Sequence, residues 1–193
     1  MCRAAQGGVE TKVGNIYASV ASRALGRVVY NFGFSGNGQM EVAVGEFLAA
    51  VTPPPAAFVI DCSWNMNAAM ITANAVPFVS YLRAHGLPET LVVFAEGSPA
   101  GDDWVSASAA AFQAESNAAL RAAYGSLAAA GDAHLGYVAT ASLFGPAALR
   151  NSATAEGLHP VDAGHHDMGA AFAAALGAAI EAHEALAGAA RVL

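Results

Sequence analysis

Glu156 and His159 are the residues of this chain whose types and spacing most directly suggest catalysis. They lie three positions apart in the segment Glu-Gly-Leu-His-Pro, just ahead of a predicted long helix. A histidine can take a proton from a hydroxyl nucleophile when a carboxylate holds one ring tautomer and stabilises the protonated form. The pair therefore predicts an acid and a base that serve a nucleophile elsewhere in the chain.

Two further segments could stabilise negative charge on a reacting carbonyl oxygen. The glycines of GFSGNG at residues 33–38 allow a tight turn whose N–H groups face a ligand oxygen. Asn65, within DCSWNMN at residues 61–67, carries an amide that could donate to the same oxygen. Simpler interpretations of both segments stay open. The glycines could form a plain strand-to-helix turn, and Asn65 and Asn67 could cap the helix that follows. The glycine spacing fits neither the dinucleotide fingerprint nor the nucleophile elbow.

Short apolar segments alternate with longer alanine-rich segments of helical spacing, which predicts an α/β protein. We expect strands at residues 27–34, 57–63, 90–95 and 134–140, and helices at residues 15–25, 41–51, 68–84, 106–130 and 164–186. The strands are apolar enough to be buried on both faces of a parallel sheet. The absence of a composition break predicts one domain over residues 1–193, and its ligands are expected at the carboxyl ends of the strands.

Charge and composition argue against several classes of function. Eight Lys+Arg against 15 Asp+Glu give a formal charge of −7, without the basic segment that nucleic-acid binding needs. The mean hydropathy of +0.42 comes mostly from alanine, and polar residues interrupt the uncharged stretch 62–82, so we expect no membrane span. The first residues contain no signal-peptide core, which makes the cytoplasm the default location. Cys2 and Cys62 are expected to be free thiols.

A second cluster of polar residues begins at the predicted base. It contains the possible metal ligands His159, Asp162, His165, His166 and Asp167. We favour the simpler interpretation, in which Asp162 caps the last helix and His165 and His166 lie in its first turns. We therefore predict no metal site.

Four motifs together resemble the SGNH, or GDSL-type, hydrolases, in the subgroup marked by NLGFSGNG and DCxxNM. They are GFSGNG, DCSWNMN, AEGSP at residues 95–99 and EGLHP at residues 156–160, in the order of the family. The resemblance runs from about Gln6 to the last helix. It implies a three-layer α/β/α sandwich with a flavodoxin-like parallel sheet.

The resemblance also implies a role for each candidate residue. Gly36 matches the glycine whose N–H donates to the oxyanion, and Asn65 matches the asparagine whose amide donates to it. His159 matches the catalytic base of the terminal DxxH block, and Glu156 stands in place of the usual aspartate, which is one methylene shorter. The implied activity is hydrolysis of a short acyl ester, such as an acetylated carbohydrate, without metal or organic cofactor. The expected partner is accordingly a small-molecule or carbohydrate ester.

The beginning of the chain departs from the family pattern. In this subgroup a strand ends in a sequence like GTSIxQGG, whose serine is the nucleophile. Alignment of QGG at residues 6–8 places Arg3 at the serine position, so the chain has no identifiable nucleophile and no strand to carry one. We expect an N-terminally truncated domain that is inactive as it stands. Loss of a central strand leaves unpaired backbone groups on two facing edges, which predicts low stability.

Three alternatives remain open. The chain could be a catalytically inactive relative that binds an ester or a glycan, or Cys2 or Ser35 could replace the serine as nucleophile. A nucleotide-binding α/β domain is an alternative from another class, although no P-loop lysine follows the glycines.

Overall fold

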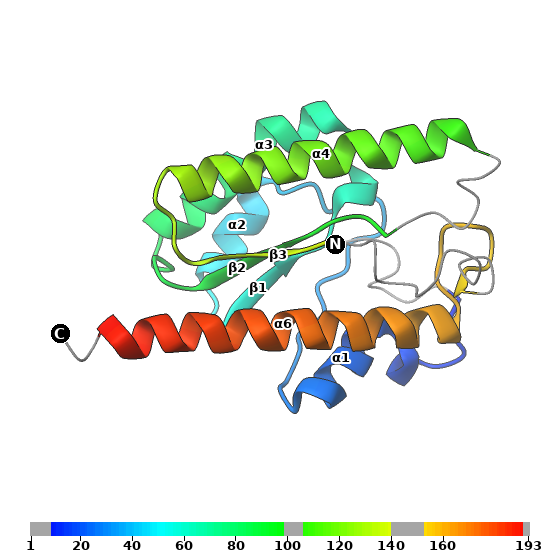
Figure 1. Ribbon diagram of the computed structural model, residues 1–193, viewed down its shortest axis with the longest axis horizontal. Helices are drawn as coiled ribbons and strands as arrows, with labels where there is room; N and C mark the ends of the chain where they lie inside the picture. The colour runs from blue at the N-terminus through cyan, green and yellow to red at the C-terminus, as the bar shows by residue number, and fades with distance from the viewer. Residues whose placement is uncertain (1–8, 99–105, 140–152, 191–193) are drawn as a thin grey trace.

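The fold is a parallel β-sheet between two layers of helices (Figure 1). The computed structural model describes residues 9–98, 106–139 and 153–190, with side chains up to Leu186. Its strands run in the order β1 (Ala57–Ile60), β2 (Leu91–Ala95) and β3 (Leu135–Val138), all parallel. Val59 lies opposite Val93 of β2, and Phe94 lies opposite Tyr137 of β3.

Helices cover both faces of this sheet, which confirms the predicted α/β/α arrangement. Figure 1 shows α2 (Val42–Ala49), α3 (Ala68–Ala84) and α4 (Ala107–Ala129) on one face. The opposite face carries α1 (Tyr17–Leu25) and α6 (Asp162–Ala190), which pack against each other. Two short 3-10 helices, η2 (Val13–Asn15) and η3 (Ser63–Asn65), lie before α1 and after β1.

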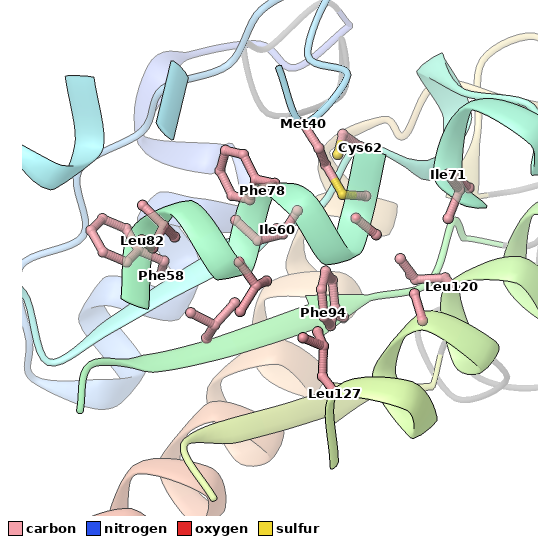
Figure 2. Packing of buried hydrophobic residues seen from close by; sticks show 14 of the residues in the cluster. Met40, Phe58, Ile60, Cys62, Ile71, Phe78, Leu82, Phe94, Leu120 and Leu127 are labelled. Carbon is pink, nitrogen blue, oxygen red and sulfur yellow. The ribbon is translucent and has the colours of Figure 1, made fainter. Parts of the chain in front are cut away.

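The core consists of two hydrophobic clusters, one on each face of the sheet. All five residues of β2 are buried, as expected for a parallel strand covered on both faces. Val92 and Phe94 point into the cluster beneath α2, α3 and α4, which Figure 2 shows. Leu91 and Val93 point toward α1 and α6. The alternation of side chains along one strand therefore joins the two halves of the core.

Residues 27–34 do not form the strand that we predict from their sequence. They belong to no strand, and β1 is the edge of the sheet within the described residues. Val28 is 78% exposed and Tyr30 is 77% exposed. A cavity of about 560 Å³ is lined by residues 27–32 together with β1. The β-branched composition favours an extended chain, but a strand is stable only where its backbone groups find partners in a ladder.

The other predicted elements are present with small changes at their ends. The bounds of α3 agree with the prediction, whereas β1 ends three residues early because Ser63–Asn65 form a 3-10 turn. The last helix begins at Asp162, whose carboxylate accepts hydrogen bonds from Thr11 N at 2.8 Å and Thr11 Oγ1 at 2.6 Å. Asp162 therefore ties the N-terminal segment to α6 instead of capping it. None of the described helices is both long and apolar enough to cross a bilayer.

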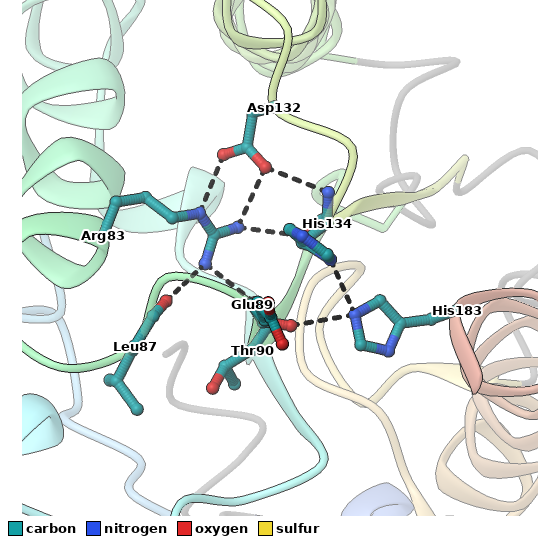
Figure 3. A network of polar contacts seen from close by, with 7 residues as sticks. All are labelled: Arg83, Leu87, Glu89, Thr90, Asp132, His134 and His183. Atoms are coloured by element: carbon teal, nitrogen blue, oxygen red, sulfur yellow. Dashed lines mark hydrogen bonds and ion pairs between the residues drawn. The ribbon is translucent and has the colours of Figure 1, made fainter. Parts of the chain in front are cut away.

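The amino ends of β2 and β3 are joined by a polar network around Arg83 (Figure 3). Arg83 Nε donates to Asp132 Oδ2 at 2.9 Å, and its two Nη atoms donate to Thr90 O at 2.8 Å and His134 O at 2.9 Å. Thr90 and His134 immediately precede the two strands. Nδ1 of His134 also lies 2.9 Å from Nε2 of His183 on α6. This network fixes one end of the sheet, opposite the end where the candidate active site lies.

Candidate active site

Gly36 lies in a turn that only a residue tolerant of positive φ adopts readily. Its φ is +69°, in the left-handed region that favours glycine. The turn is closed by the N–H groups of Asn37 and Gly38, which donate to Phe34 O at 3.1 and 3.3 Å. Within the described part of the chain, the Gly36 N–H donates to no other group. This N–H is therefore able to bind an incoming oxygen atom.

Asn65 lies beside the same turn because two hydrogen bonds join them. Its Nδ2 donates to Gly38 O at 3.3 Å, and Gln39 Nε2 donates to Asn65 O at 3.3 Å. The helix-capping interpretation is confirmed for Asn67, whose Oδ1 accepts a hydrogen bond from Met70 N at 2.9 Å. It is wrong for Asn65, whose side chain points to the glycine turn. Asn65 is thus joined to the segment that directly follows Gly36, through Gly38 and Gln39.

Glu156 and His159 are in direct contact, as their spacing suggests. Oε1 of Glu156 contacts Nδ1 of His159, whose side chain is 14% exposed against 53% for the glutamate. Ala155 N donates to His159 O at 2.9 Å, and Thr154 pairs with Pro160 in an isolated β-bridge, so the loop is closed on itself. A carboxylate at Nδ1 selects the tautomer whose Nε2 can accept a proton. The longer side chain of glutamate is therefore compatible with the geometry.

Both pairs lie at the carboxyl end of the sheet. Figure 1 shows the yellow-orange loop of residues 153–161 beyond the ends of the strands, and η3 directly follows β1 at the same end. Ser35 is an exposed residue of the glycine turn. Arg3, at the predicted nucleophile position, lies outside the described residues, and so does its neighbour Cys2.

Two buried carboxylates at the strand ends were not identified from the sequence. Asp61, directly after β1, is 7% exposed and accepts a hydrogen bond from Tyr17 Oη at 2.5 Å. Burial raises the pKa of Asp61, and the bond from Tyr17 partly opposes this rise. Glu96, directly after β2, accepts hydrogen bonds from Tyr137 Oη at 2.8 Å and from Arg121. An acidic residue immediately after a buried strand is the signal that could have identified both.

His165 is a core residue and not the ordinary first-turn histidine that we predict. It is 0% exposed, and its Nδ1 accepts a hydrogen bond from Tyr17 N at 3.3 Å. Among the described residues, its Nε2 has no hydrogen-bond partner, and it lies 3.8 Å from Glu10 Oε2. Burial lowers the pKa of His165, and the nearby charges of Glu10 and Asp162 partly oppose this lowering. His165 therefore packs as a neutral ring between α1 and α6.

The remaining candidate ligands and thiols do not form a reactive centre in the described residues. Within residues 9–98, 106–139 and 153–190, no three His, Cys, Asp or Glu side chains lie in a group that could hold a metal ion. Cys62 is a buried free thiol, as predicted. Burial raises its pKa to about 11, which keeps it protonated and unreactive near neutral pH.

Trp64 and Gly97 fix the loop that follows β2 against η3. Trp64 Nε1 donates to Ser98 O at 3.0 Å, and its ring stacks on Phe112 with centroids 6.1 Å apart. A Cβ atom at Gly97 would lie 2.6 Å from Ser63 Oγ, so this close approach requires glycine. Gly97 N donates to Asn117 Oδ1 at 2.9 Å. These contacts join the loop after β2 to η3 and α4.

Comparison with known proteins agrees with this arrangement. A protein-family model described as the GDSL-like lipase/acylhydrolase family matches residues 2–177. A protein from Bacteroides ovatus ATCC 8483, described as a GDSL-like lipase, has a TM-score of 0.86 at 26% identity, over 93% of this chain and 52% of its own. No curated protein sequence matches the chain.

Two further solved structures share the fold at lower identity. Salicylyl-acyltransferase SsfX3, from a tetracycline biosynthetic pathway, has a TM-score of 0.73 at 17% identity, over 89% of this chain and 51% of its own. A carbohydrate acetylesterase family member from Sinorhizobium meliloti has a TM-score of 0.56 at 18% identity, over 92% of each chain. The chain thus spans about half the length of the first two structures.

Proposed function

Because the chain belongs to the GDSL-like lipase/acylhydrolase family, we propose that its site serves hydrolysis of a short acyl ester by a serine mechanism. The observation that carries the proposal is the contact between Glu156 Oε1 and His159 Nδ1 at the carboxyl end of the sheet. Such a pair orients an imidazole and stabilises its protonated form. We also propose that the chain belongs to the subgroup of this family that is marked by NLGFSGNG and DCxxNM.

The proposed mechanism has two steps of acyl transfer. A serine hydroxyl attacks the ester carbonyl carbon while His159 Nε2 takes its proton, and the Gly36 N–H and Asn65 Nδ2 hold the oxyanion. The protonated His159 then gives its proton to the leaving alcohol, which forms the acyl-enzyme. Water attacks the acyl group with His159 again as base, and the carboxylic acid and free serine result.

A structural likeness supports the choice of substrate class. The carbohydrate acetylesterase family member from Sinorhizobium meliloti shares the fold, and this likeness is our reason for placing acetylated carbohydrates among the candidate substrates. An acetyl group is also the shortest acyl chain, which makes p-nitrophenyl acetate a suitable first probe.

We expect residues 1–193 to have no esterase activity, because no nucleophile is identified in their sequence. Arg3 occupies the position that the resemblance assigns to serine. Without a nucleophile the pair at Glu156 and His159 has no hydroxyl to activate. Binding of an ester or a glycan without cleavage is then the remaining activity of the chain.

The test compares hydrolysis of p-nitrophenyl acetate by the chain and by Arg3→Ser. We expect background rates from the chain and a gain in Arg3→Ser that falls by about 10²- to 10⁴-fold when His159→Ala is added. Asn65→Ala should lower the gained rate about 10²-fold. His166→Ala, at a histidine whose side chain is 74% exposed, is the matched control and should have no effect. Hydrolysis that persists without His159 would contradict its role, and no gain from Arg3→Ser would contradict the placement of the nucleophile.

A further inference from the structure

The buried face of α4 changes from apolar to polar toward its amino end. Leu120, Ala123 and Leu127 of this face pack in the hydrophobic core, whereas Ser116 and Asn117, one turn earlier, are buried polar residues. Because α4 follows β2 in a parallel sheet, its amino end lies near the carboxyl end of the sheet, where the candidate site lies. A buried hydroxyl or amide without a partner costs free energy, so the partners of these two side chains indicate what they do.

The partners are backbone groups of the two segments that follow β1 and β2. Ser116 Oγ donates to Met66 O at 3.0 Å. Gly97 N donates to Asn117 Oδ1 at 2.9 Å, and Asn117 Nδ2 donates back to Gly97 O at 3.3 Å. Gln113, one turn earlier on α4, also donates to Gly97 O. The side chain of Asn117 thus pairs with both backbone groups of Gly97, as a residue of a neighbouring strand would.

Gly97 transmits this constraint to η3. A Cβ atom at Gly97 would lie 2.6 Å from Ser63 Oγ and 3.1 Å from Trp64 Cδ1, so the backbone of Gly97 lies directly against η3. Trp64 Nε1 donates to Ser98 O at 3.0 Å, which closes the same contact from η3. Helix α4 therefore reaches η3 by two routes, directly at Met66 and through Gly97.

Asn65 lies between these fixed points. It is the last residue of η3, and its carbonyl oxygen accepts a hydrogen bond from Gln39 Nε2 at 3.3 Å. The next carbonyl along the chain, that of Met66, is the one held by Ser116. With its backbone held in this way, Asn65 places Nδ2 at 3.3 Å from Gly38 O, beside the glycine turn. A displacement of about 1 Å in a group that acts on the reacting atoms can cost about 10²-fold in rate.

From these contacts we infer that Ser116 and Asn117 are positioning residues, which act through η3 to hold the Asn65 amide where an oxyanion would bind. The inference rests on the proposed function, in which Asn65 is an oxyanion donor. Neither residue has a step in the proposed mechanism, because their hydrogen bonds go to Met66 and Gly97. No residue of α4 belongs to the four sequence motifs, so this part of the site is indicated only by buried polar residues on a helix.

A double-mutant cycle distinguishes positioning from a general structural role. It is measured in Arg3→Ser with p-nitrophenyl acetate, under conditions where urea unfolding shows that each variant is folded. Asn117→Ala should lower kcat about tenfold and leave KM within about twofold, because an oxyanion donor acts in the transition state. In an Asn65→Ala background, where the donor is already lost, the same substitution should lower kcat less than about twofold.

Ser116→Ala is the second variant, because it removes one hydroxyl from the buried face and leaves a good helix former. It should lower kcat in the same way, and only while Asn65 is present. Ser126→Ala is the matched control, since Ser126 is exposed on the same helix and its hydroxyl donates to Ala122 O of that helix at 2.9 Å. This control should leave kcat unchanged. If Asn117→Ala does not fold, the cycle with Ser116→Ala decides the question.

A spectroscopic measurement in residues 1–193 does not depend on turnover. We expect a nuclear Overhauser effect between the side-chain amide of Asn65 and the Hα protons of Gly38, because Asn65 Nδ2 donates to Gly38 O. Asn117→Ala and Ser116→Ala should weaken or remove it, and Ser126→Ala should leave it at the parent intensity. If Arg3→Ser does not turn over the ester while this signal weakens as expected, the proposed function fails and the positioning of Asn65 by α4 is supported.

Three results would overturn the inference. The first is a loss of kcat that is equal with and without Asn65, which would assign the two residues a general structural role. The second is an active Arg3→Ser chain in which neither Ser116→Ala nor Asn117→Ala lowers kcat. The third is a nuclear Overhauser effect between Asn65 and Gly38 that stays at the parent intensity in both variants.

Discussion

Asp61→Asn should change how the stability of this protein depends on pH. The carboxyl group of Asp61 is buried at the end of β1 and is bound by Tyr17 Oη at 2.5 Å. Burial raises its pKa above the ordinary value of 3.8. The folded state therefore holds this proton more tightly than the unfolded state. The stabilisation from Asp61 is fully present below pH 3.8, falls as the pH rises from 3.8 to the folded-state pKa, and is lost above that.

The magnitude follows from the linkage between protonation and folding. Each unit by which the folded-state pKa is raised removes about 1.4 kcal/mol of the free energy of unfolding over that pH range. Asparagine carries no charge and keeps an oxygen that can accept the bond from Tyr17. Asp61→Asn should therefore match the parent in acid and exceed its stability at neutral pH.

Tyr17→Phe tests the opposing contribution of the hydrogen bond. Loss of this hydrogen bond should lower the free energy of unfolding by about 1.5–3 kcal/mol where Asp61 is ionised. In the Asp61→Asn background the loss should be about 0.5–1.5 kcal/mol. The assay is urea unfolding between about pH 3 and pH 8, which covers both ends of the expected change. Asp167→Asn, at an exposed carboxylate on α6, is the control and should give a profile parallel to that of the parent. An Asp61→Asn profile that is parallel to the parent, or lower at neutral pH, would refute the reasoning.

Two pairs of substitutions test the packing of the fold by urea unfolding. Gly97→Ala should destabilise by about 1–3 kcal/mol, because the added Cβ would lie 2.6 Å from Ser63 Oγ, whereas Gly125→Ala, with no atom within 4 Å, should stabilise by about 0.5–1 kcal/mol. Equal effects at the two glycines would contradict the close approach. Leu120→Ala, at a fully buried side chain, should cost about 2–5 kcal/mol, and Leu186→Ala, at one that is 57% exposed, should cost less than about 0.5 kcal/mol. A small loss at Leu120 would contradict its place in the core.

Local sequence predicted the elements whose partners lie within the described chain. The bounds of α3 were correct, and the apolar sequence of β2 corresponds to five buried residues. Residues 27–34 have a similar β-branched and aromatic composition and still form no strand. Periodicity and propensity describe how a segment could fold, but a strand also needs a neighbour, and no property of residues 27–34 reports whether that neighbour is present.

The candidate site was predictable where it is local and unpredictable where it depends on packing. Glu156 and His159 are three residues apart, so one loop brings them into contact. Residue type and local spacing could not distinguish Asn65 from Asn67, because only the 3-10 turn before α3 directs one to the glycine turn and the other to the helix end. The burial of His165 had a signal, since Met168 and Phe172 follow at helical spacing on the same apolar face.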